Sequence, residues 1–208
     1  MKPILIFLLG LTLCLSADEA AKKQFEETKA KAEKGNKIAQ FYLGMMYDNG
    51  EGVLEDDKEA VKWFRKAAEQ GSPEAQANLG VMCFSGFGVE KDDKASFEWF
   101  RKAAEQNFPY AQPSLGYMYH YGLGVEKDVV KAYAWYNIAG AGHGGKILKD
   151  KLAKKMTPDQ ITKAEALQEG ILKKILIALA EKGDAEAQNK IGLIYFEGKG
   201  VEKDFKEA

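Results

Sequence analysis

The chain has 208 residues, of which 46% are hydrophobic, which is enough to form a substantial core and excludes a disordered tail. Thirty basic residues nearly balance thirty-one acidic ones, and the formal net charge is −1. Binding to phosphates requires a strongly cationic face, so the composition argues against nucleic acid as the main partner.

The first 17 residues have the pattern of a secretory signal peptide. Lys2 precedes an apolar run over 4–15, and charged residues resume at Asp18. The run is too short for a typical membrane span. Small residues at Ser16 and Ala17 permit cleavage after either one. We expect an exported mature chain, periplasmic or secreted and without a membrane span; an uncleaved anchor is the alternative.

Two cysteines are present, Cys14 and Cys83. Cys14 lies in the signal segment, so the mature chain has no intramolecular disulfide. A lipid-modified Cys14 is disfavoured because Leu13 is bulky. Tyrosine occupies the positions that match Cys83 in the rest of the chain, which favours a small buried thiol. A catalytic thiol would need a nearby histidine, and neither His120 nor His143 has a suggestive spacing.

A unit of 36 residues recurs along the chain. Such a fixed interval is typical of a stack of small, similar structural units. It is kept by three glycines, three tryptophans and three valines: Gly44, Gly80 and Gly116; Trp63, Trp99 and Trp135; Val53, Val89 and Val125.

Each repeat is predicted to be a pair of helices joined by a glycine-rich loop. A leading helix over 18–35, ended by Gly35 as a left-handed cap, precedes repeat 1 at 36–71. In repeat 1, Gly44 lies where the partner helix must come close. Asp56, with Glu59 three residues later, resembles a capping box for the second helix.

Repeats 2 and 3 follow the same pattern at 72–107 and 108–142. Repeat 2 begins with Ser72 as a cap and Pro73 at the first helical position. In repeat 3, Pro113 would remove an intrahelical hydrogen bond, so we expect a bent or late-starting helix there.

The 36-residue interval is then interrupted by an inserted segment at 143–170. The glycines of 140–145 favour irregular backbone, and the lysine and hydroxyl of a phosphate loop are missing. A basic helix over 146–155 is expected next. Thr157, Pro158 and Gln160 then signal a strong capping box for a helix that ends near Gln168.

A second leading helix is expected over 171–183, apolar enough to be well buried. Repeat 4 resumes at 184–208 but lacks most of its second helix. Repeat arrays usually end in a polar capping helix, so we expect repeat 4 to be truncated.

The recurring residues resemble the Sel1-like repeat family, a relative of the tetratricopeptide repeat. The shared pattern is alanine, leucine-glycine, tyrosine, glycine-x-glycine-valine, aspartate, alanine and tryptophan-aromatic, over 39–139 and 183–208. Segments 131–137 and 156–160 also resemble a closing element of bacterial members. The resemblance implies an all-α fold, a right-handed α-solenoid of antiparallel helix pairs that scaffolds protein assembly. Some secreted relatives carry a cysteine pair in each repeat, and this chain does not.

If the first helices line a concave surface, as in the tetratricopeptide relatives, residues in equivalent register become binding candidates. Ala77 and Asn189 share this register. The candidates are unexpectedly apolar and aromatic for a solvent-facing surface, which usually marks a partner site. The alternative is that they pack against the inserted helices or one another. They are Phe41, Met45, Asp48, Val81, Phe84, Tyr117, His120, Tyr121, Leu193 and Phe196.

We therefore predict an exported scaffold that binds a protein or peptide in a concave groove, with no cofactor, metal or enzymatic activity. A cell-envelope hydrolase is the first alternative, because such activities are attributed to a few relatives. Catalysis needs an activated nucleophile or a metal cluster, and the two histidines do not have ligand spacing. The second alternative is purely architectural, with 146–180 locking two arrays together or docking onto another subunit.

Overall fold

The structure is a computed structural model that describes the backbone of residues 2–140 and 144–197 and the side chains of 18–140 and 144–194. Every regular element in these ranges is an α-helix, as the sequence predicts. The chain divides into two compact units, unit 1 (Met1–Trp99) and unit 2 (Phe100–Ala208).

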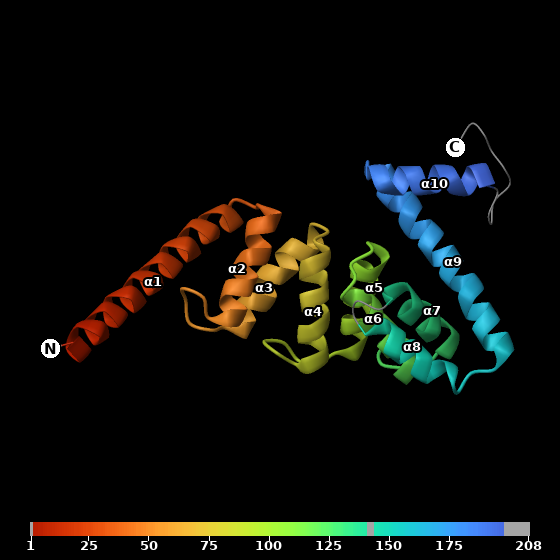
Figure 1. Cartoon of the computed structure of the whole chain (residues 1–208), viewed down its shortest axis with the longest axis horizontal. Helices are drawn as coiled ribbons and strands as arrows, with labels where there is room; N and C mark the ends of the chain where they lie inside the picture. Colours follow the sequence, from red (N-terminus) through yellow and green to blue (C-terminus); the bar gives the residue numbers. More distant parts are fainter. Residues whose placement is uncertain (1, 141–143, 198–208) are drawn as a thin grey trace. The chain divides into compact units, whose positions relative to one another are not determined.

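Unit 1 begins with one long helix and continues with shorter helices of similar length (Figure 1). The predicted leading helix is the second half of the long helix, and Gly35 after it has a φ of 87°, as expected for a left-handed cap. The helices are α1 (Lys2–Glu33), α2 (Lys37–Asn49), α3 (Asp57–Glu69) and α4 (Pro73–Ser85), and the unit ends within α5 (Asp93–Glu105).

Helices α2 and α3 form an antiparallel pair. Beside their loop, the backbone N–H of Asp56 donates to the carbonyl of Tyr47 at 2.9 Å. At the other end of the pair, the side-chain amide of Gln70 donates to that of Gln40 at 2.6 Å. Between these points a Cβ at Gly44 would lie 2.6 Å from the ring of Phe64. The close approach predicted at Gly44 is confirmed.

The predicted helix starts in unit 1 are confirmed. The carboxylate of Asp56 accepts hydrogen bonds from two N–H groups of the first turn of α3, at 3.0 and 3.1 Å. The hydroxyl of Ser72 accepts one from Ala75 at 3.3 Å. The second hydrogen bond of the capping box, from the backbone N–H of Asp56 to the Glu59 carboxylate, is replaced. The Glu59 carboxylate instead accepts from the ammonium of Lys62 at 3.0 Å.

A buried glutamine in each first helix of unit 1, absent from the repeat pattern above, joins its repeat to the helix that precedes it. Gln40 donates to the carbonyl of Ala32, and Gln76 donates to that of Ala68, both at 3.1 Å. These carbonyls lie in the last turns of α1 and α3, where the helix supplies no i+4 partner. The glutamines are 36 residues apart, so the repeat interval could have identified them as a recurring feature of the repeat.

Two apolar clusters form the core of unit 1. Trp63 lies in the first and Trp99 packs, partly buried, against the second, so the two tryptophans occupy equivalent places, as the repeat interval predicts. The first cluster, from α1, α2 and α3, contains Phe25, Ala32, Ala39, Leu43, Met46 and Trp63. The second, from α3 and α4, contains Ala60, Val61, Phe64, Ala67, Ala68, Ala75, Leu79 and Met82.

Unit 2 repeats the same pairing and then departs from it. Helices α6 and α7 are antiparallel: Asp128 donates to the carbonyl of Tyr119 at 2.9 Å, and a Cβ at Gly116 would lie 2.7 Å from the ring of Tyr136. Helices α8 and α9 both pack against α7. The helices after α5 are α6 (Ala111–Tyr121), α7 (Val129–Ala139), α8 (Gly145–Ala153), α9 (Pro158–Glu181) and α10 (Ala185–Glu197).

The late start predicted for the first helix of repeat 3 is confirmed. Helix α6 begins at Ala111 and has 11 residues, whereas α2 and α4 have 13. Pro113 is thus the third helical residue. In the first turn a backbone N–H would have no intrahelical acceptor, so the missing N–H of proline costs no hydrogen bond there.

The helix end predicted near Gln168 is wrong, because α9 continues to Glu181 with Gly170 in its interior. A single glycine costs a helix only about 1 kcal/mol, which is too little to end it. The capping box at Thr157 and Gln160 is confirmed, with hydrogen bonds of 2.9 and 3.2 Å. The segment at 171–180 is less buried than expected: Ile175 is buried, and its neighbours are half-buried or exposed.

The expected basic helix is α8, and irregular backbone precedes it. Gly140 and Gly144 have φ values of 62° and 73°. Residues 141–143, with His143, and the end of repeat 4 at 198–208 lie outside the described residues. Within the described ranges, no helix combines the length and the hydrophobicity that crossing a bilayer requires.

We predict opposite effects of alanine at two helical glycines of unit 2. Gly116→Ala should lower the free energy of unfolding by about 1–3 kcal/mol, because the new methyl group overlaps the buried ring of Tyr136. Gly170→Ala, with nothing within 4 Å of its Cβ, should raise it by about 0.5–1 kcal/mol. Urea denaturation of both variants measures the two effects. Equal stability of the variants would contradict the close packing at Gly116.

Candidate functional site

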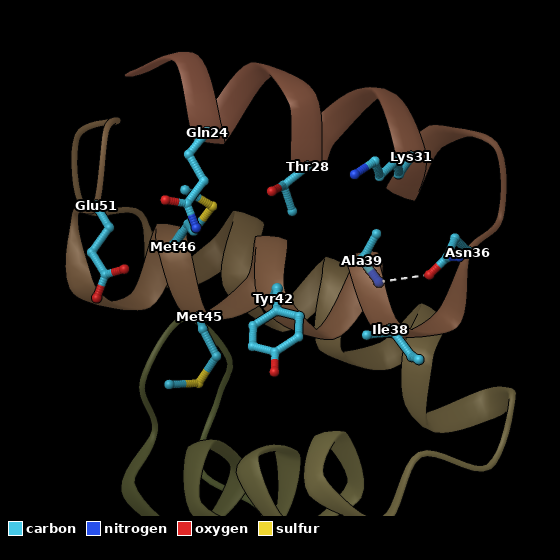
Figure 2. A pocket seen from close by; sticks show the side chains of 10 residues that line it. All are labelled: Gln24, Thr28, Lys31, Asn36, Ile38, Ala39, Tyr42, Met45, Met46 and Glu51. Atoms are coloured by element: carbon cyan, nitrogen blue, oxygen red, sulfur yellow. Dashed lines mark hydrogen bonds between the residues drawn. The ribbon is translucent and has the colours of Figure 1, made fainter. Parts of the chain in front are cut away.

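In unit 1, α1 and α2 border an open groove of about 390 Å³ (Figure 2). Polar side chains of α1 line one wall: Gln24 and Thr28 extend toward α2, and Lys31 lies beside them. The opposite wall is apolar and includes Ile38, Tyr42, Met45 and Met46 of α2.

The apolar wall is open to solvent. Ile38 is 64% exposed and Tyr42 is 57% exposed. Neither residue was among the predicted site residues, although Met45 beside them was. Residues 38, 42 and 45 recur at helical spacing on one side of α2, so the sequence held this signal. What it did not reveal is that α1 borders that side.

Of the candidates on α2, Phe41 and Met45 are both half-buried and pack against the core cluster that contains Phe64. The ring centroids of Phe41 and Phe64 are 5.9 Å apart. Met45 also reaches the groove. Asp48 is half-buried, and burial, together with the carboxylates of Asp57 and Glu55, raises its pKa.

On α4, Val81 is 48% exposed. Phe84 is half-buried, and the ammonium of Lys91 lies 5.4 Å from its ring centroid. Cys83, next to it, is buried, and burial raises the pKa of its thiol. The thiol is therefore protonated at neutral pH and is a poor nucleophile.

In unit 2, four residues form what we call the aromatic cluster: Tyr117, His120 and Tyr121 of α6 and Tyr136 of α7. The ring centroids of Tyr117 and Tyr121 are 4.5 Å apart. His120 stacks on Tyr121 at 4.4 Å, with 24° between the planes. Tyr117 and Tyr121 are 40% and 56% exposed. Tyr136 is fully buried beneath them, with its hydroxyl 3.5 Å from Nδ1 of His120.

The aromatic cluster is electrically neutral at neutral pH. Burial lowers the pKa of His120, and the nearby ammonium groups of Lys127 and Lys155 lower it further. Burial, followed by the phenols of Tyr121 and Tyr117, raises the pKa of Tyr136. The cluster is therefore an uncharged surface with two cations close to it.

The last two candidates lie on α10. Leu193 is 58% exposed, and the side chain of Phe196 lies outside the described residues. The structure thus brings three of the candidates, Tyr117, His120 and Tyr121, into direct contact. Within the described ranges, no group of three or more histidine, cysteine, aspartate or glutamate residues is placed to hold a metal ion.

The Sel1 repeat pattern matches the chain at 37–72, 73–108, 109–142 and 185–208. Solved structures that are similar to it include the following two. A protective antigen of uropathogenic Escherichia coli with an SLR fold is 34% identical, with a TM-score of 0.57 over 79% of this chain and 43% of that one. A Sel1 repeat protein from Oxalobacter formigenes is 44% identical, with a TM-score of 0.56 over 62% of this chain and 98% of that one.

The chain therefore spans less than half the length of the Escherichia coli protein. Among curated proteins, none matches the chain. The four matched segments cover more than half of the chain, and in segments 37–72 and 109–142 the two helices pair as the sequence predicted. The chain belongs to the Sel1 repeat family, whose members are protein–protein interaction scaffolds, and its fold is an α-solenoid of antiparallel helix pairs.

Proposed function

We propose that the protein is an exported scaffold that binds a peptide or helix of a partner protein on the exposed faces of its first helices. The observation that carries this proposal is the aromatic cluster, in which two tyrosine rings in contact with each other are 40% and 56% exposed. Exposed aromatic rings offer a large contact area with few rotatable bonds, and they dominate the energetics of many interfaces.

The repeat fold does not itself require these rings. The positions equivalent to Tyr117 hold Met45 and Val81. Those equivalent to Tyr121 hold Asn49 and Ser85, which are polar and exposed. Because the same helix pair forms with methionine, valine, asparagine or serine at these places, the fold of the repeat does not require tyrosine there. A partner-binding surface accounts for two exposed rings side by side.

The groove of unit 1 supports the same function. Its wall on α2 exposes Ile38 and Tyr42, and its volume of about 390 Å³ is at the lower end of the range of ligand pockets. An open groove of this size accommodates one or two side chains of a bound peptide. Both units thus present apolar side chains of a first helix to solvent.

Export is supported by two observations. The apolar run at 4–15, with Lys2 before it and small residues after it, has the pattern of a signal peptide. The similar Escherichia coli protein is a protective antigen, a kind of protein that the immune system has to encounter.

Replacing both exposed tyrosines should weaken partner binding strongly without unfolding the chain. Tyr117→Ala with Tyr121→Ala should weaken the affinity at least roughly 30-fold, because interface hot spots are each worth about 2 kcal/mol or more. Crosslinking and quantitative mass spectrometry of captured envelope proteins measure the loss, and circular dichroism checks the fold. Phe87→Ala, which removes a 55% exposed ring in unit 1, is the control and should change nothing. If the original chain, the double tyrosine variant and the Phe87→Ala variant captured the same partners equally, the aromatic cluster would not be part of the binding site.

The signal segment can be tested separately. In a Gram-negative host, the exported chain should begin at Ala17 or Asp18 by N-terminal sequencing. Leu9→Arg, which places a charge in the apolar run, should leave the precursor in the cytoplasm, whereas Lys22→Gln should not. A chain that starts at Met1 in the envelope fraction would favour the uncleaved anchor. Retention of the unmodified chain in the cytoplasm would refute export.

A further inference from the structure

We propose that the aromatic cluster recognises an acidic segment of its protein partner, and that Lys127 and Lys155 bind the carboxylates of that segment. This inference rests on the proposed function and names the chemistry of the partner at the same site. It follows from the position of two uncompensated cations beside an uncharged apolar surface.

The two lysines approach the cluster from different elements. Lys127 lies in the loop between α6 and α7, and it packs next to the end of α6: a Cβ at Gly122, the residue after Tyr121, would lie 3.2 Å from Cβ of Lys127. Lys155 follows α8. Ala153 and Met156, which lie on either side of it in the sequence, pack against the buried cluster that contains Tyr136. Both lysine side chains are exposed, and both ammonium groups lower the pKa of His120.

Neither lysine is neutralised within the part of the chain that the structure describes. Some lysines of unit 2 do have carboxylate partners: Lys131 lies 3.2 Å from Asp128 and Lys146 lies 2.7 Å from Asp150. No such ion pair is found at Lys127 or Lys155 in the described ranges. A pair of unpaired cations attracts a carboxylate-bearing partner and sets its orientation.

Lys155 also ends the most basic segment of the unit. Residues 145–155 contain five lysines and one acid, Asp150, in a chain whose net charge is −1. The positive charge is therefore local to α8 and the two lysines that follow it. Since screening lengths are about 10 Å at 0.1 M salt, this charge acts on a partner docked beside His120.

The partner segment should combine acids with an apolar or aromatic side chain. The neutral rings of Tyr117 and Tyr121 stack with an apolar or aromatic group, whereas the lysines require carboxylates at its sides. Nucleic acid and anionic membranes also present negative charge. Each, however, requires an extensive cationic face, and the balanced composition of this chain does not favour one.

Selection from a random peptide library on the full-length chain tests the inference, with fluorescence anisotropy of the selected peptides as the readout. The selected peptides should carry net negative charge and at least one apolar or aromatic residue. Lys127→Glu with Lys155→Glu should weaken their binding roughly tenfold or more, as expected for two charge pairs at an interface. The matched control is Lys58→Glu with Lys94→Glu, which makes the same charge change at exposed lysines of unit 1 and should leave the affinity unchanged.

The outcomes separate this inference from the function on which it rests. Neutral or basic peptides that need Tyr117 and Tyr121 but tolerate both lysine changes would overturn the inference and leave the proposed function standing. Peptides that tolerate loss of the tyrosines, or no selected peptide at all, would overturn both. Vesicles of phosphatidylglycerol and phosphatidylcholine, and a single-stranded oligonucleotide, are tested in parallel. Binding to either that depends on the tyrosines and the lysines would replace the acidic peptide as the ligand.

Discussion

The contact between a glycine of the first helix and a ring of the second is the constraint on which each described pair depends. Phe64 and Tyr136 are fully buried and lie so close to Gly44 and Gly116 that a methyl group would overlap them. Because interiors are close-packed, the missing side chain on one helix defines the space that the ring of the other helix fills. The distance between the helices, and hence the geometry of the pair, follows from this contact.

The loop between the helices fixes the pair at one end and joins it to the preceding helix. The same backbone hydrogen bond closes three repeats, from the N–H of Asp56, Asp92 and Asp128 to the carbonyls of Tyr47, Cys83 and Tyr119. In unit 1, the second loop glycine also touches the backbone of an earlier helix: Gly52 touches Ala21 and Gly88 touches Asp57. One short loop therefore closes a repeat and holds it against its neighbour.

Because the inner side of each first helix and the loop make the packing contacts, the outer side of the first helices is available for binding. The inner side and the loop carry the packing, so the outer side can hold methionine, valine or tyrosine at one equivalent position. Tyr136 connects the two roles, because its ring fills the space at Gly116 while its hydroxyl lies beneath His120. The stability of repeat 3 and the arrangement of the aromatic cluster thus depend on the same side chain.

The sequence by itself determined the repeat period, the helix pairs, the close approach at Gly44 and the capping residues. These features depend on residues close together in the chain, and the same residues recur every 36 positions. The sequence also found Tyr117, His120 and Tyr121 by register, but it did not reveal that Tyr121 contacts the rings of both other residues, or that Phe41 packs on the core. Only the tertiary structure decided those contacts, together with the unbroken α9, the wall of α1 beside Tyr42 and the placement of Lys127 and Lys155 near His120. The unbroken α9, the wall of α1 and the placement of Lys155 each depend on how a non-repeating segment packs against a repeat, and a segment that occurs once leaves no periodic signal.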